Sequence, residues 1–208
     1  MKKTTLFTLL AIAVSCFFAA CSGDENVNPT PTPTEDVLYF FKGNLGGEAV
    51  DLSLTLSNDI TNYHSHGGSL GEMCTFDYGA SIGDQFDNPP LFDFELKSMY
   101  SGECDAENDA FNGLITPATF TYYEDGTPNA VSVTVGMMTA DGYFNSQYGT
   151  QTGASFEITS STETNNTFGK FQLLEGTVNC TLYKEDDNSQ SIELENGTFK
   201  LDVASYFN

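Results

Sequence analysis

Short runs in which apolar and polar residues alternate recur along most of this chain, and turn-forming residues separate them. From residue 37 onward there are about eight to eleven such runs, and none has the three-to-four-residue spacing of a helix. Alternation with a period of two predicts strands that bury one face. Because no segment is available as a crossover helix, we expect antiparallel pairing. The predicted fold is all-β: an antiparallel β-sandwich of about 8–11 strands, or alternatively a closed or partly open β-barrel.

The expected strands begin with a hairpin. Residues 37–44 and 49–56 flank Gly46-Gly47, and Leu52, Leu54 and Leu56 are expected on one face. Pro89-Pro90 is expected to break the structure before the next clear run. The last strand should turn Thr198, Lys200 and Asp202 outward. Turns are expected at Asp125-Gly126, Asp141-Gly142, residues 186–188 and Asn196-Gly197. Further inward positions are expected at Phe92, Phe94, Leu96, Phe120, Tyr122, Val131, Val133, Val135, Phe156, Ile158, Val178, Cys180, Leu182, Phe199, Leu201 and Val203.

The first 20 residues have the features of a secretory signal. Lys2-Lys3 precede an uncharged, mostly apolar run over residues 6–20, and small residues lead to Cys21. A membrane-spanning helix needs about 20 apolar residues, so this run is short for that role. The following segment, Pro29 to Thr34, alternates proline with threonine and predicts an extended spacer. We therefore expect a signal peptide over 1–20, a lipidated Cys21 and Pro/Thr-rich tether over 21–36, and a single all-β domain over 37–208.

Two segments resemble known lipoproteins. Phe18-Ala19-Ala20-Cys21 resembles a lipobox, and Ser22 to Glu25 is similar to the acidic signal that sends Bacteroidota lipoproteins to the outer surface of the outer membrane. Residues 176–183 and 196–201 resemble the closing G-T-F and N-G-T-F strands of uncharacterised Bacteroidota surface lipoprotein domains, with Val178 in place of an aromatic. The resemblance implies that Cys21 is acylated and that the domain faces the cell exterior. It implies no biochemical activity.

The charge of the chain limits its partners. It has seven lysines, no arginine and 29 acidic residues, so without the signal five lysines face all 29 acids and the net charge is −24. Nucleic-acid binding is excluded because clustered basic residues are missing. Such a chain should favour cations or neutral ligands. We expect a membrane partner through the lipid and a surface glycan or protein as ligand, while the sequence leaves the oligomeric state open.

The five cysteines have different expected roles. Cys16 leaves with the signal and Cys21 carries the lipid. Cys180 lies on the apolar side of its predicted strand and is expected to be a small buried hydrophobe. In an oxidising export route, Cys74 and Cys104 are then left as a candidate disulfide.

One motif resembles a catalytic one without its context. Gly67-Gly68-Ser69-Leu70-Gly71 matches the G-x-S-x-G nucleophile elbow. That elbow requires a following helix and a later histidine, and no histidine follows His66. We expect a glycine-rich loop, and no catalytic residue is assigned.

Two segments contain candidate metal ligands. His64 and His66 would share a face if they lie on a strand, although a solvated loop pair is the expected arrangement. Asp105, Glu107 and Asp109 alternate in what is expected to be a loop and offer oxygen ligands for Ca²⁺. Residues 185–188 form a second acidic segment, expected at a hairpin tip. No cofactor is assigned, and calcium is kept as an alternative.

These features favour a non-catalytic surface lipoprotein that acts as a binding or structural module. Residues 143–149 mix aromatics with amides, a composition that can bind sugars but is also ordinary in strands and turns. The alternative function is a secreted hydrolase whose active site the sequence does not reveal.

Overall fold

The computed structural model describes residues 36–58, 61–69, 73–85, 88–101, 107–124, 127, 129–136, 142–166 and 169–205. These residues all belong to one compact unit, Glu35–Asn208. The predicted signal sequence, Cys21, the tether, Cys104 and Asp105 lie outside the described residues. Within the described part, no helix is long and apolar enough to cross a membrane.

The described residues form eleven strands, one α-helix and one 3₁₀ turn. Their bounds are β1 (Tyr39–Leu45), β2 (Glu48–Leu54), β3 (Thr61–Ser69), β4 (Met73–Gln85), β5 (Asn88–Ser101), α2 (Glu107–Leu114), β6 (Ala118–Tyr122), β7 (Ala130–Gly136), β8 (Tyr143–Asn145), η1 (Ser146–Tyr148), β9 (Ser155–Asn166), β10 (Gly169–Lys184) and β11 (Ser191–Ser205).

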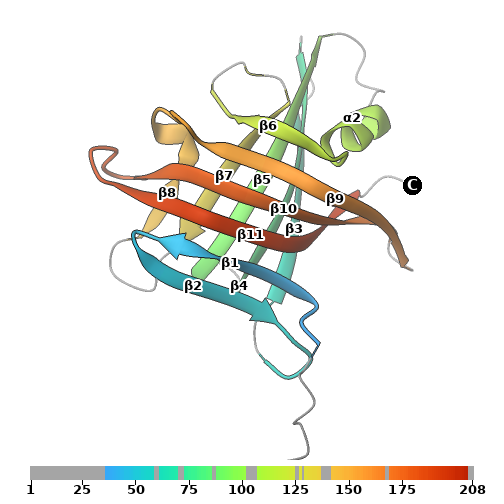
Figure 1. The fold of residues 1–208 in the computed structure, drawn as a ribbon. Helices are drawn as coiled ribbons and strands as arrows, with labels where there is room; N and C mark the ends of the chain where they lie inside the picture. The colour runs from blue at the N-terminus through green and yellow to red at the C-terminus, as the bar shows by residue number, and fades with distance from the viewer. Residues whose placement is uncertain are drawn as a thin grey trace, which may run out of the picture. The chain divides into compact units, whose positions relative to one another are not determined.

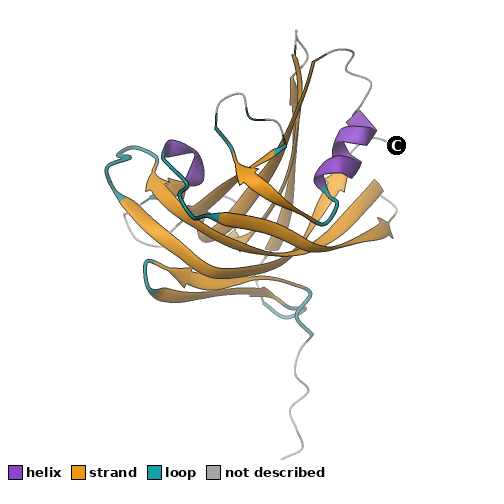
Figure 2. Ribbon diagram, turned by 45° about the horizontal axis from the view of Figure 1, so that its top comes forward, coloured by secondary structure: helices purple, strands orange, loops and turns teal. Residues whose placement is uncertain are grey.

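The strands join in the order β2-β1-β11-β10-β9-β6-β7-β5-β4-β3, and β8 pairs with both β7 and β10. Among the described pairs all are antiparallel except β6 with β7, which is parallel. The sheet folds back on itself, so that β9, β10, β11, β1 and β2 cross in front of β3, β4, β5 and β7 (Figures 1 and 2). Strand β11 packs against both β3 and β4. The predicted all-β, sandwich-like fold is confirmed.

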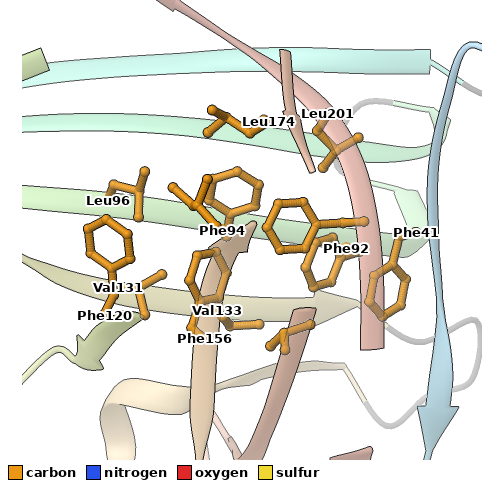
Figure 3. Packing of buried hydrophobic residues seen from close by; sticks show 14 of the residues in the cluster. Phe41, Phe92, Phe94, Leu96, Phe120, Val131, Val133, Phe156, Leu174 and Leu201 are labelled. Atoms are coloured by element: carbon orange, nitrogen blue, oxygen red, sulfur yellow. The ribbon is translucent and has the colours of Figure 1, made fainter. Parts of the chain in front are cut away.

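The space between the two groups of strands is filled by phenylalanine rings packed among leucine and valine side chains (Figure 3). The rings of Phe41 and Phe92 stack with their centroids 3.8 Å apart. The Phe199 ring lies 5.1 Å from that of Phe94 and 5.2 Å from that of Phe156. Full burial of such a side chain stabilises a fold by about 1.5–3 kcal/mol relative to exposure. This aromatic core joins strands that are more than 100 residues apart in the sequence.

The two-residue alternation predicted most of these inward positions correctly. On β5, Phe92, Phe94 and Leu96 are fully buried, while Asp93 and Glu95 point to the opposite face. The predicted hairpin is also confirmed, with its turn at Gly46-Gly47, both at positive φ. Leu56 was expected to continue the buried face of this hairpin, but that expectation is wrong: it lies beyond the end of β2 and is 83% exposed.

The expected turn at Asn196-Gly197 is wrong. Both residues lie inside β11, where Glu195 and Asn196 together face the single residue Asn179 of β10, which makes a β-bulge. Asn196 has φ 54°, the left-handed conformation that also occurs in hairpin turns. A bulge and a turn therefore have the same local sequence signal, and long pairing on both sides decides between them.

The structure also corrects two expectations about the middle of the chain. Pro89 and Pro90 lie inside β5 instead of before it; β7 pairs with β5 only from Leu91 onward, so the prolines are not required to donate to that ladder. The expected absence of helices is wrong at α2. Phe111 and Leu114 pack one face of this short helix onto the core, with the Phe111 ring 4.9 Å from that of Tyr78. Its Asn, Asp and Gly residues have low helix propensity and conceal the pattern.

Candidate functional site

Two depressions flank the loop 150–154, which joins η1 to β9. The larger has a volume of about 510 Å³ and is called the threonine pocket here. Its lining includes Phe120 and Tyr122 of β6, the carboxylate residue Glu124, and five threonines: Thr119, Thr121, Thr127, Thr150 and Thr152. Ligand pockets usually measure about 300–1,000 Å³, so this depression is large enough for a small ligand.

The smaller depression, the bulge pocket, has a volume of about 310 Å³ and lies on the other side of the same loop. Its polar lining consists of Thr152, Asn179, Thr181, Glu193, Glu195 and Asn196. The bulge in β11 widens the sheet here, and the Asn196 backbone N–H donates to Oδ1 of Asn179 at 2.7 Å instead of to a ladder carbonyl. The pocket is therefore a consequence of the bulge, and an amide side chain holds its shape.

Gln151 holds the loop between the two depressions. Its Nε2 donates to the main-chain oxygens of Ser146 and Thr181, each at 2.7 Å. Its Oε1 accepts from the Thr181 backbone N–H at 3.1 Å. This side chain therefore satisfies backbone groups of Ser146 and Thr181 that lie beside the loop 150–154. The loop is fixed before any ligand arrives.

Tyr122 and the neighbouring Cys180 stay uncharged at neutral pH. The Tyr122 hydroxyl is the donor to two main-chain oxygens, that of Asn179 at 3.0 Å and that of Ser155 at 3.2 Å. Burial raises the pKa of Tyr122 above its ordinary range, and it raises the pKa of the Cys180 thiol to about 12. Cys180 is buried, as predicted. A thiol with so high a pKa is a poor nucleophile at neutral pH.

A second polar region, the acidic strip, lies on the outer face of β4 and β5 and consists of Asp77, Asp93, Glu95 and Lys97. Burial first, and then the charge of Glu95, raise the pKa of Asp93 to about 7. The Lys97 ammonium lies 3.3 Å from Oε2 of Glu95 and 4.6 Å from the centre of the Tyr123 ring. Sequence reasoning did not single out these residues. Asp93 and Glu95 were marked only by their places between Phe92, Phe94 and Leu96.

A third polar region, the seam cluster, lies where edge strand β3 meets β1 and β11, and it consists of Tyr39, Asn62, His64 and Asp202. The Tyr39 hydroxyl donates to Oδ2 of Asp202 at 3.0 Å, and Asn62 donates to Oδ1 of the same carboxylate. Nδ1 of His64 lies 3.0 Å from the Asp202 main-chain oxygen. Burial, and then the Asp202 charge, raise the pKa of Tyr39 to about 12, so this phenol remains a donor at neutral pH.

The seam cluster overturns two predictions. Asp202 was expected to face outward, but only 13% of its side chain is exposed because β3 lies against this end of β11. The expected solvated loop around His64 and His66 is strand β3, and the His64 ring contacts the ring of Phe171 edge-on. His66 lies opposite Tyr78 in the β3–β4 register, and its side chain is outside the described part.

The other candidate motifs are not brought together. The expected glycine-rich loop is wrong for Gly67, Gly68 and Ser69, which end strand β3 and pair with β4. The next described element is that strand, β4, instead of the helix that a nucleophile elbow requires. Glu107 and Asp109 lie in helix α2, so the expected loop over residues 105–109 is wrong there. The partner expected for Cys74, Cys104, falls outside the described residues, and the disulfide stays a prediction.

Two sequence segments took their expected ordinary roles. Residues 185–190 form the turn between β10 and β11, where the Asp187 carboxylate accepts from the Ser189 hydroxyl at 2.5 Å. In residues 143–149, Asn145 and Gln147 use their side-chain amides internally, on Thr134 and Ser132. These amides are therefore not available to a sugar.

Across the described residues, no group of three or more His, Cys, Asp or Glu side chains is placed to hold a metal ion. Comparison with known proteins does not add a family: no family model, no curated protein and no solved structure matches this chain. A functional proposal therefore depends on the geometry of the two pockets, the acidic strip and the seam cluster.

Proposed function

We propose that this chain is an exported, lipid-anchored binding module without catalytic activity, and that the threonine pocket binds a neutral, hydroxyl-rich ligand of the glycan class. The observation that carries the proposal is the lining of that pocket. Five threonines present both methyl groups and hydroxyls, which suits a sugar with its alternating C–H faces and hydroxyl groups. Glu124 adds one acceptor at the rim.

Three further features support this choice. Phe120 and Tyr122 also belong to the lining and add uncharged aromatic surface to the pocket. The loop 150–154 is held by Gln151, so little ordering free energy is lost on binding. The charge of −24 on the mature chain disfavours anionic ligands and leaves neutral ones. The lipobox at Cys21 would display such a module on the cell surface.

The test is native affinity electrophoresis through gels that contain one neutral polysaccharide each: starch, dextran, galactomannan or xylan. We expect at least one gel to retard the protein. The double variant Thr121→Val with Thr152→Val keeps the shape of the pocket but removes two hydroxyls, and it should abolish the retardation. Thr162→Val, on an exposed strand position outside the pocket, should not change it. Equal retardation of both variants, or no retardation in any gel, would contradict the proposal.

The acidic strip favours the alternative, a secreted hydrolase. A carboxyl group with a pKa of about 7 beside a second carboxyl group can act as a general acid at neutral pH. If this region is catalytic, the protein should hydrolyse some member of a panel of nitrophenyl glycosides, and Asp93→Asn should remove that activity. We expect no turnover above background with either protein.

A further inference from the structure

The seam cluster brings together donor atoms from strands that are distant in sequence. Asn62 and His64 come from β3, Asp202 from β11 and Tyr39 from β1. Positions 64 and 202 are separated by 138 residues, yet His64 Nδ1 lies 3.0 Å from the main-chain oxygen of Asp202 and 3.8 Å from its Oδ1. The contacts involve an imidazole, a carboxylate, an amide and a main-chain carbonyl, all of which are common metal ligands.

Among the described residues, no lysine forms an ion pair with this cluster. The Asp202 side chain is 13% exposed, and among the described ion pairs its partner is His64. A carboxylate that is largely removed from water loses hydration free energy unless a cation or several donors compensate. Here two neutral donors reach it, the hydroxyl of Tyr39 and the amide of Asn62.

A second observation concerns the amide oxygen of Asn62. Oδ1 of Asn62 is buried and has no hydrogen-bond partner in the described structure. A buried amide oxygen without a donor destabilises the structure that contains it. A cation, like a donor, would satisfy it.

The arrangement of the Asp202 carboxylate also fits a ligand. The Tyr39 hydroxyl donates to Oδ2, while Oδ1 accepts from Nδ2 of Asn62 and lies 3.8 Å from Nδ1 of His64. Metal-binding carboxylates are commonly oriented by such an outer hydrogen bond. With metal–ligand distances of about 2.1 Å, neighbouring ligand atoms lie about 3.0–3.4 Å apart. The separations of 3.0 and 3.8 Å from His64 Nδ1 are within about half an ångström of that range.

We propose that the seam cluster binds one divalent transition-metal ion, with zinc as the ion to test, through the His64 imidazole, the carboxylate and main-chain oxygen of Asp202, and the amide oxygen of Asn62. Tyr39 is the outer-shell residue that orients the carboxylate. Two of these residues, His64 and Asp202, have side chains of the types His, Cys, Asp and Glu. The amide oxygen of Asn62 and the main-chain oxygen of Asp202 complete the set of ligands. A metal ion here would attach edge strand β3 to β11, and this inference does not depend on the glycan proposal.

The test is a titration of the full lipidated chain in detergent, first freed of metal with EDTA, with ZnCl₂, CaCl₂ or MgCl₂. Isothermal calorimetry should show one saturable zinc site per chain and at least tenfold weaker binding of calcium and magnesium, because imidazole favours zinc. His64→Ala and Asp202→Asn should each weaken zinc binding at least tenfold. Tyr39→Phe should weaken it about tenfold, as removal of outer-shell partners typically does.

The controls separate this site from other acidic and histidine groups. Glu157→Gln removes an exposed carboxylate of β9 and should bind zinc normally. His66→Ala distinguishes a histidine pair: loss of binding in His66→Ala with normal binding in Asp202→Asn overturns the proposal. Unchanged binding in both His64→Ala and Asp202→Asn also overturns it. If circular dichroism shows that His64→Ala is unfolded, His64→Gln replaces it and should show the same weakening.

Discussion

Burial controls which single residues of this sheet can carry charge. Asp93 lies between Phe92 and Phe94 on β5, whereas Asp187 lies in the turn between β10 and β11. Burial raises the pKa of Asp93 to about 7, whereas hydrogen bonds from Ser189 and Gln190 lower the pKa of the exposed Asp187. Neither pKa shift can be predicted from sequence, because the local sequence does not show whether a carboxyl group is buried or accepts hydrogen bonds. What surrounds the carboxyl group decides.

Asp93 should therefore destabilise the fold as the pH rises. Its folded pKa of about 7 exceeds its ordinary value of 3.8, so the folded state binds the proton more tightly, and this stabilisation is lost between about pH 4 and 7. Asp93→Asn does not titrate. Its free energy of unfolding, relative to the native protein, should rise across that window by at most about 4 kcal/mol and stay constant above it.

Urea unfolding at pH 4, 5.5, 7.5 and 8.5 measures this difference. Glu185→Gln, which removes an exposed carboxylate in the β10–β11 turn, is the matched control and should show little pH-dependent difference. A constant difference between Asp93→Asn and the native protein at all four pH values would show that Asp93 ionises normally.

At the scale of elements, the sequence predicted the strands well and the contacts between distant strands poorly. Phe92, Phe94 and Leu96 alternate because one face of β5 is buried, and that pattern is local. The contact of His64 with Asp202 depends on how the sheet folds back, which no local pattern encodes. The residues of the threonine pocket come from β6, from the loop that follows it and from the loop 150–154, and threonine is common enough in strands to give no signal.

Two glycines differ in the space that an added methyl group would find. A Cβ at Gly197, beside the bulge, would lie 2.6 Å from the Val178 main-chain oxygen and 2.4 Å from its side chain. A Cβ at Gly113, in helix α2, would meet nothing within 4 Å. Gly197→Ala should therefore destabilise the fold by about 1–3 kcal/mol. Gly113→Ala should stabilise it by about 0.5–1 kcal/mol through helix propensity.

Thermal melting separates these two variants, since 1 kcal/mol corresponds to about 2–4 °C for a domain of this size. We expect a lower melting temperature for Gly197→Ala and a slightly higher one for Gly113→Ala. If Gly197→Ala melts at the same temperature as the native protein, the β10–β11 bulge can widen without loss of stability.

The loop 150–154 depends on one side chain. Gln151→Ala leaves the Thr181 backbone N–H and the main-chain oxygens of Ser146 and Thr181 without these bonds. We expect a loss of about 1–3 kcal/mol in the free energy of unfolding and faster amide hydrogen exchange in residues 150–154. Gln190→Ala, in the exposed β10–β11 turn, should leave exchange in this loop unchanged. Normal protection in Gln151→Ala would mean that other contacts fix the loop.

At the scale of the whole molecule, location depends on Cys21. If that cysteine is acylated, Cys21→Ser should move the protein from the membrane fraction to the soluble fraction, because each buried methylene contributes about 0.8 kcal/mol to anchoring. Fractionation of cells followed by immunoblotting measures this. Cys180→Ser, at a buried position of β10, serves as the control for a serine substitution elsewhere and should stay with the membrane. If Cys21→Ser still needs detergent for extraction, the chain is held by something other than a lipid on that residue.

The net charge of −24 should make the stability of the whole molecule depend on salt. With so many carboxylates on one domain, neighbouring charges lie within a Debye length of about 8 Å at physiological ionic strength, and their repulsion destabilises the compact state. NaCl should therefore raise the melting temperature, and CaCl₂ at matched ionic strength should raise it by nearly the same amount. A calcium site at residues 105–109 would instead give a larger, saturable shift, because a ligand that binds only the folded state adds its own stabilisation. Asp105→Asn with Asp109→Asn would remove that excess. We expect equal shifts for the two salts and no effect of the double variant beyond its change in charge; a saturable calcium shift that the double variant removes would assign the metal to this segment.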